Sequence, residues 1–183
     1  CETDLPGLYA IGEMASGGKD GADRLPGTAL PFCMAMGIVA GRETAARAKE
    51  VPMPKIDEGQ AKRFMERALA PIKREQQGIS PIEIKQRIRK VMSTHAVFAR
   101  TEEGLSTALR EIEGLRDEAA PKLWAQAKTK RFNLEWMEAF EAENMVITCE
   151  MVLRNALMRK ESRGLHERAD YPDEDPQWLK HIM

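Results

Sequence analysis

Apolar residues recur at spacings of three and four along the chain after Pro54, and this is the period of an α-helix. The stripes comprise, in chain order, Ala61, Met65, Ala68, Leu69 and Ile72; Ile84, Ile88, Val91, His95 and Phe98; Leu105, Leu109, Ile112 and Leu115; and Trp136, Phe140, Ile147, Met151 and Met158. Ser80-Pro81 with Glu83, and later Asn133, are typical of helix N-termini. Helices with one apolar face pack together, so the sequence predicts a mainly α fold: an antiparallel bundle of three long helices plus a preceding helix.

The first 50 residues follow a different pattern. Residues 8–11 form a short apolar run between turn residues, which predicts a strand buried on both faces of a parallel sheet. Residues 14–28 are rich in glycine and predict a loop, and a helix is expected to begin near Thr28, with Thr28 as its N-cap. This part is therefore expected to be a small α/β segment.

A proline pair divides the chain. Pro52 and Pro54 each bias the preceding residue toward extended geometry, so they end the first long helix and indicate a linker. We expect one domain over residues 1–50 and a second, helical domain over residues 51–183. The second domain is expected to end in an extended tail, because the helical spacing stops near Glu161.

Composition excludes several classes of function. Lys and Arg number 28 against 29 for Asp and Glu, a formal net charge of −1, so the chain lacks the positive field that nucleic-acid binding requires. Cys1, Cys33 and Cys149 form no C-x-x-C pair, which argues against a disulfide framework and a metal site and favours a reducing, cytoplasmic compartment. No apolar run reaches the roughly 18 residues typical of a transmembrane helix.

One constellation has the order strand, Gly12-Glu13, glycine-rich loop, Arg24 and helix N-terminus near Ala29. Ligands of open α/β sheets bind where a strand ends beside a helix N-terminus, and the helix N–H groups there favour an anion. Glu13 is a candidate for holding cofactor hydroxyls, and Arg24 for binding a substrate carboxylate through two parallel hydrogen bonds. Without further information the same pattern also fits an ordinary loop.

A second constellation gathers Arg163, His166, Arg168 and Asp170 in the tail. Its cations are candidates for orienting two domains against each other or for approaching a cofactor. A buried network of ion pairs is the alternative, and the residue types favour it, because structural networks gather the same side chains.

Four motifs carry a resemblance that covers nearly the whole chain. Residues 7–13 read GLYAIGE, residues 21–25 read GADRL, residues 161–172 read ESRGLHERADYP and residues 178–181 read WLKH. These motifs resemble the C-terminal part of the flavoproteins of the succinate dehydrogenase and fumarate reductase family. L-aspartate oxidase shares GLYAIGE and SRGLH and is a relative of that family.

The resemblance implies an FAD-dependent oxidoreductase that transfers a hydride between flavin and a small carboxylate substrate. It implies that Gly12 and Glu13 contact the ribityl part of FAD, that the backbone at Ala29 and Leu30 approaches the flavin pyrimidine, and that Arg24 binds a dicarboxylate. Residues 1–50 are then the end of an FAD-binding domain. An iron–sulfur protein of electron transfer is an implied partner, and a location at the inner face of a membrane an implied site of action.

The sequence also departs from the family pattern. Asp20 stands in place of a His, Asp23 in place of an Asn, and Thr28-Ala29 in place of Asn-Ser, which leaves the substrate open. The glycine fingerprint for the dinucleotide, the covalent-flavin His and the proton-donating Arg have no counterpart in residues 1–183. The catalytic residues are therefore unknown and expected upstream of Cys1, and this portion alone is expected to be inactive. A non-catalytic helical module that docks an iron–sulfur partner, and an L-aspartate oxidase-like enzyme, are the alternatives.

Overall fold

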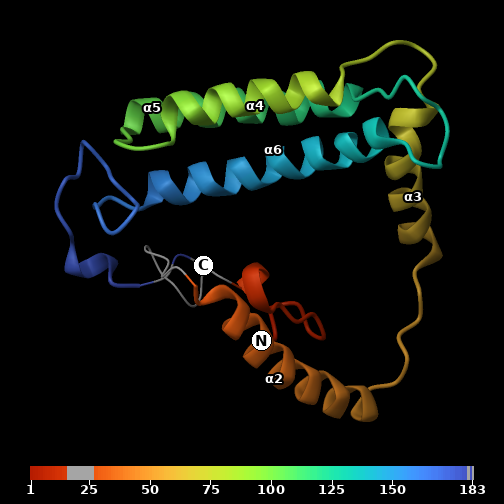
Figure 1. Ribbon diagram of the computed structural model, residues 1–183, viewed down its shortest axis with the longest axis horizontal. Coiled ribbons are helices and arrows are strands. Elements are labelled where there is room, and N and C mark those ends of the chain that lie inside the picture. Colours follow the sequence, from red (N-terminus) through yellow and green to blue (C-terminus); the bar gives the residue numbers. More distant parts are fainter. Residues whose placement is uncertain (16–26, 181, 183) are drawn as a thin grey trace. The chain divides into compact units, whose positions relative to one another are not determined.

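The computed structural model describes residues 1–15, 27–180 and 182 (Figure 1). They divide into two compact units, which we treat separately. The N-terminal unit contains Cys1–Ile56 and the short segment Arg163–Leu165, and the helical unit contains Asp57–Ser162 and His166–Ile182.

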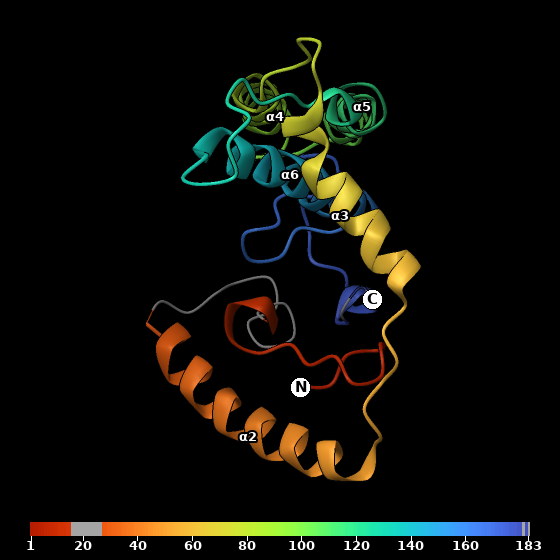
Figure 2. The same cartoon turned by 90° about the vertical axis from the view of Figure 1, so that its right-hand side faces the viewer.

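The helical unit is built from four α-helices and confirms the predicted bundle. They are α3 (Glu58–Lys73), α4 (Pro81–His95), α5 (Glu102–Gly114) and α6 (Leu134–Met158), and three short turns follow or separate them: η2 (Leu115–Ala119), η3 (Ala120–Lys122) and η4 (Pro176–Trp178). Helices α4, α5 and α6 lie side by side, with α5 antiparallel to both others, and α3 packs against α6 (Figures 1 and 2).

Side-chain caps set three of the four helix starts. The side-chain oxygens of Asp57, Thr101 and Asn133 accept hydrogen bonds from the backbone N–H groups three residues further on. Helix α4 differs, because it begins with Pro81 at its first position and the Ser80 side chain makes no capping hydrogen bond. Ser80-Pro81 with Glu83 therefore predicts the start of α4 correctly, although the Ser80 side chain does not cap the helix.

The core of the helical unit lies between α4, α5 and α6. It is formed by Ile84, Ile88 and Val91 of α4, by Leu105, Ala108 and Ile112 of α5, by Leu115 and Ala119 of η2, by Leu123, and by Ala139, Ala142, Val146, Leu153 and Ala156 of α6. Interiors pack at close to crystal density, so short alanine side chains on α6 let it approach two helices at once.

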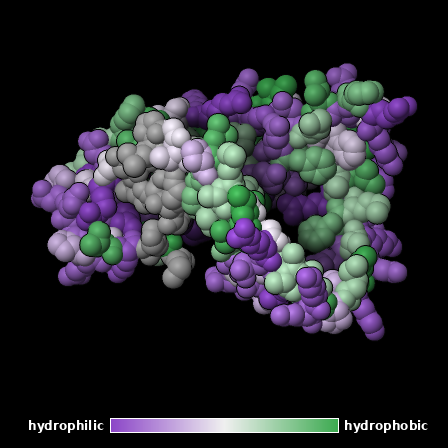
Figure 3. Space-filling model, turned by 60° about the horizontal axis from the view of Figure 1, so that its bottom comes forward, coloured by the Kyte–Doolittle hydropathy of each residue, from purple (hydrophilic) through white to green (hydrophobic). Residues whose placement is uncertain are grey.

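The predicted buried stripe of α6 is wrong. Ile147, Met151 and Met158 are 44%, 60% and 53% exposed, and Phe98, predicted to extend the stripe of α4, is 81% exposed beyond the end of that helix. Helix α6 is apolar on more than one side, so its periodicity did not identify the side that faces the core. Apolar side chains on the surface of the molecule appear green among hydrophilic ones in Figure 3.

The N-terminal unit contains η1 (Gly12–Ala15) and α2 (Ala29–Glu50), which pack against each other. Within residues 1–15 and 27–56 the only bridge is antiparallel, between Glu2 and Tyr9, and Leu8 is 53% exposed. The predicted buried parallel strand over residues 8–11 is therefore wrong here, because such a strand requires neighbouring parallel strands. Helix α2 begins at Ala29 as predicted and ends before Val51.

None of the helices in the described part of the chain is both long and apolar enough to cross a membrane.

Alanine substitutions of two isoleucines, one buried on α5 and one partly exposed on α6, test which side of these two helices faces the core. Ile112→Ala removes a side chain that is 0% exposed, and we expect the free energy of unfolding to fall by about 2–5 kcal/mol. Ile147→Ala removes the same atoms from a 44% exposed position and should cost less than about 1 kcal/mol. Equilibrium urea unfolding measures both, and equal losses would contradict the core assignment.

Candidate functional site

Gly12 sits at a tight turn against α2. Its φ of +60° lies in the left-handed region that side chains rarely adopt, and the residue is buried. A Cβ atom at Gly12 would lie 2.7 Å from Sγ of Cys33, closer than real Cβ contacts. A glycine is therefore required here, and it holds η1, including Glu13, directly against α2.

The first turn of α2 supplies the backbone N–H groups of the candidate cofactor site. Ala29 and Leu30 are its first two residues, and Leu30 is 77% exposed. The N–H groups in the first turn of any helix lack carbonyl partners within the helix and carry its positive dipole end. The structure thus brings Gly12 and Glu13 together with the helix that begins at Ala29 and Leu30, as the sequence order suggested.

The third member of this constellation, Arg24, lies outside the described residues, as do Asp20 and Asp23. The binding of a carboxylate by Arg24 therefore stays a prediction.

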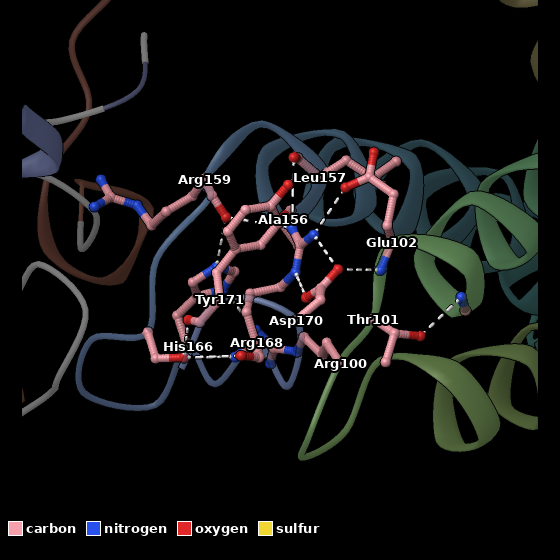
Figure 4. A network of polar contacts seen from close by, with 12 residues as sticks. Arg100, Thr101, Glu102, Ala156, Leu157, Arg159, His166, Arg168, Asp170 and Tyr171 are labelled. Carbon is pink, nitrogen blue, oxygen red and sulfur yellow. Dashed lines mark hydrogen bonds and ion pairs between the residues drawn. The ribbon is translucent and has the colours of Figure 1, made fainter. Parts of the chain in front are cut away.

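Arg168 is the centre of a polar network in the helical unit (Figure 4). Its side chain is 0% exposed. Nε and Nη2 donate to the two carboxylate oxygens of Asp170 at 2.8 and 2.9 Å, and Nη2 also donates to Glu102 Oε2 at 2.8 Å. Nη1 donates to the carbonyl of Ala156 at 2.8 Å, and the Tyr171 ring lies 4.9 Å from the guanidinium carbon.

These contacts join three parts of the helical unit. Ala156 belongs to the last turn of α6, Glu102 begins α5, and Asp170 belongs to the tail. Asp170 also accepts a hydrogen bond from the backbone N–H of Glu102 at 2.8 Å, so it acts on the N-terminus of α5. The hydrogen bonds from Arg168 hold the pKa of Asp170 well below its usual range. Asp170 is therefore ionised at neutral pH and pairs with the Arg168 guanidinium.

His166 lies beside this network, with both ring nitrogens engaged. Nδ1 is 3.0 Å from Nη1 of Arg100, and Nε2 is 3.1 Å from the carbonyl oxygen of Arg159. A guanidinium only donates, so Nδ1 accepts and Nε2 carries the proton, which makes the ring neutral. Burial lowers the pKa of His166, and the neighbouring cations Arg100, Arg168 and Arg159 lower it further.

The rest of the tail motif is bonded within the same loop. Ser162 Oγ accepts from the backbone N–H of Arg168 at 2.8 Å and donates to the carbonyl of Tyr171 at 2.8 Å. Glu161 is fully buried, pairs with Arg159, and accepts from the N–H of Asp175 at 2.9 Å. Arg163 lies between these anchored residues and is half-buried.

Sequence reasoning did not find every member of the network. Arg100, Glu102 and Arg159 received no role, although Arg100 and Glu102 contact the tail from a distant part of the sequence. Their separation of 66 residues from His166 and Arg168 gives no local pattern. Arg159 lies two residues before the tail motif. This position is the one sequence feature that relates Arg159 to the network.

The described part of the chain contains no cluster of three or more His, Cys, Asp or Glu side chains suited to a metal ion. A groove of about 540 Å³ lies between α4 and η2, where Val91, Leu115 and Ala119 contribute to its lining. None of the predicted site residues lines this groove, so it is separate from both constellations.

Comparisons with known proteins agree on one family. The family model described as fumarate reductase flavoprotein C-term matches residues 85–183. A fumarate reductase (CoM/CoB) subunit of Methanothermobacter marburgensis is 34% identical over 99% of this chain, and the fumarate reductase flavoprotein subunit of Haemophilus influenzae is 31% identical over 100% of it. The solved Sdh1 complex of Mycobacterium smegmatis in the apo form contains a chain that is 30% identical over 93% of this one, with a TM-score of 0.86. This chain spans 32%, 31% and 28% of those three proteins.

The lowered pKa of His166 predicts a pH dependence of stability. Between its ordinary value of 6.5 and the lower folded value, the unfolded chain binds a proton that the folded chain does not. The contribution of His166 is therefore complete above pH 6.5 and is lost as the pH falls through the folded pKa. Urea unfolding followed from about pH 7.5 downward through about pH 6.5 should show a steeper loss for the natural chain than for His166→Gln. Identical slopes would contradict the assignment.

Proposed function

This chain belongs to the fumarate reductase flavoprotein C-terminal family, and we propose from this that it is the C-terminal part of an FAD-dependent oxidoreductase. The parent protein transfers a hydride between flavin and a carbon of a carboxylate-bearing substrate. The observation that carries the proposal is the family match over residues 85–183, which covers the tail network described above. The packing of η1 against α2 supports it independently, because it lies outside the matched region.

FAD, when bound, supplies the redox chemistry of such a protein. The residues of the N-terminal unit fit this group. Glu13 offers a carboxylate that accepts hydrogen bonds from ribityl hydroxyls, and the backbone N–H groups at Ala29 and Leu30 offer donors to the electron-rich pyrimidine edge. Gly12 fixes the position of Glu13 relative to these donors through its contact with Cys33.

Arg24 is proposed as the residue that binds the substrate carboxylate. A guanidinium makes two parallel hydrogen bonds to a carboxylate, which orients as well as attracts it. Asp20 and Asp23 lie close to Arg24 in the sequence and depart from the family pattern, so we assign the substrate no further than a carboxylate.

The cluster of Arg163, His166 and Arg168 is proposed to orient the helical domain, residues 51–183, against the FAD-binding domain. His166 and Arg168 hold the loop in place, and Arg163 lies within that loop. The proposed partner is an iron–sulfur protein of electron transfer, and the proposed location is the inner face of a membrane. The similar proteins include one component of a fumarate reductase and one chain of an Sdh1 complex, which supports a role within an assembly.

Arg24→Lys in the full-length parent tests the proposed chemistry. The charge stays but the paired hydrogen bonds are lost, so turnover of fumarate or succinate with a redox dye should fall by about 10²-fold or more while bound FAD is unchanged. Flavin absorbance, melting temperature and turnover are measured on one preparation. Unchanged turnover with a lowered melting temperature would make Arg24 structural, and a parent that binds no FAD would overturn the proposed function itself.

Gly12→Ala tests the cofactor turn. The new Cβ atom meets Sγ of Cys33 at 2.7 Å and strains a φ of +60°, so the turn must move away from α2. We expect the full-length parent to purify with less than half of the FAD of the natural protein, as an order-of-magnitude expectation for about 1 kcal/mol of strain. Gly41→Ala is the control, because a Cβ there, on α2, meets nothing within 4 Å. Equal flavin contents in the two variants would contradict the role of Gly12.

A further inference from the structure

Phe132 is the one residue other than glycine with a positive φ among the described residues. Its side chain is 98% exposed and its φ is +52°, in the left-handed region. A bulky side chain is disfavoured there, and an exposed aromatic ring gains no packing that would compensate. Backbone strain of this kind clusters at binding and catalytic sites. The strain at the exposed Phe132 therefore points to contact with a partner.

The loop that carries Phe132 is held in place by hydrogen bonds. Asn133 is buried, and its side-chain amide donates to the carbonyls of Ala127 and Thr129 at 2.8 and 2.9 Å. The ammonium group of Lys128 donates to the carbonyls of Arg74 and Ala125, both at 2.7 Å. The exposed position of Phe132 is therefore built into the structure of the loop.

The local sequence offers Phe132 a place to pack, and the structure does not use it. Asn133 caps α6, so Phe132 and Met137 occupy the two positions that form a hydrophobic staple at many helix starts. Here Phe132 is 98% and Met137 57% exposed, and Leu134 between them is 74% exposed. Three large apolar side chains at one end of α6 thus remain open to solvent.

Two cationic residues directly precede Phe132 in the sequence. The side chains of Lys130 and Arg131 are exposed, and neither forms an ion pair with any residue in the described ranges. Glu135 is the acidic residue of the first turn of α6, and its carboxylate is occupied by the backbone N–H groups of Gln126 and Ala127. The two positive charges are therefore accessible to a partner.

We propose that these five residues form a docking surface for a protein partner that presents an apolar face edged by carboxylates. We call it the Phe132 patch; it comprises Lys130, Arg131, Phe132, Leu134 and Met137. Aromatic anchors beside arginine are typical of the energetically dominant positions of protein interfaces. A nucleic acid fits less well, because the chain as a whole has a net charge of −1. The patch belongs to the bundle and does not depend on the flavin chemistry proposed above.

Two synthetic helical peptides serve as probes for the chain of residues 1–183. They share one leucine-rich face, and one carries glutamates and the other lysines on the remaining positions. Fluorescence anisotropy of the labelled peptides should give at least tenfold tighter binding for the acidic peptide. The double variant Lys130→Glu with Arg131→Glu should reverse this preference.

Phe132→Asn separates binding from folding. Asn tolerates the left-handed region better than Phe, so the melting temperature should stay equal or rise, while binding of the acidic peptide should weaken at least tenfold. Phe98→Ala is the control, because Phe98 is also exposed, at 81%, but lies in the turn after α4, and it should leave binding unchanged.

Several results would overturn the proposal. They are equal binding of the two peptides, binding of neither, or binding that Phe132→Asn does not weaken. Sedimentation with vesicles of phosphatidylglycerol and phosphatidylcholine provides a further arm. If those vesicles retain the natural chain but not Phe132→Asn, and the acidic peptide does not bind, the patch is a membrane contact and the protein partner is excluded.

Discussion

The buried guanidinium of Arg168 is the interaction on which the tail of this chain depends. A charge removed from water is tolerated only when it is paired and its hydrogen bonds are satisfied. Asp170 and Glu102 provide the opposite charge, and the carbonyl of Ala156 takes a further donor. Removing Arg168 would leave these groups unpaired at the end of α6 and the start of α5, so the tail and the bundle are stabilised by the same side chain.

The period of apolar residues predicted the helices well, because a helical stripe is a local property. The starts at Pro81 and Leu134 follow from a proline and a capping residue that can be recognised in the sequence, and Thr28 marks the start at Ala29 without a capping hydrogen bond from its side chain. The buried side of α6 could not be predicted in this way. That helix carries large apolar residues on one side and three alanines with Val146 and Leu153 on another, and only the approach of α4 and α5 determines that the second side is buried.

The order of the candidate cofactor residues along the chain could be recognised from the sequence. Their contacts with one another could not. Gly12 and Glu13 are candidates because they follow an apolar run and precede a glycine-rich stretch of the sequence. The strand itself was not found in the structure, because a parallel strand needs partners that residues 1–15 and 27–56 do not provide. The contact between Gly12 and Cys33 joins residues that no local pattern relates, and it explains why a glycine is needed.

The polar atoms of the tail motif are used within the protein itself. Both nitrogens of His166, the hydroxyl of Ser162 and all three guanidinium nitrogens of Arg168 are hydrogen-bonded within the helical unit. A side chain with every polar atom engaged has none left for a substrate, so these residues act by fixing the backbone around them. The segment they fix contains Arg163 and Gly164, whose φ of +55° makes the tight turn possible. The motif thus forms a buried polar network that positions a loop. The residue types favoured such a network, and the structure adds that its polar atoms are already engaged.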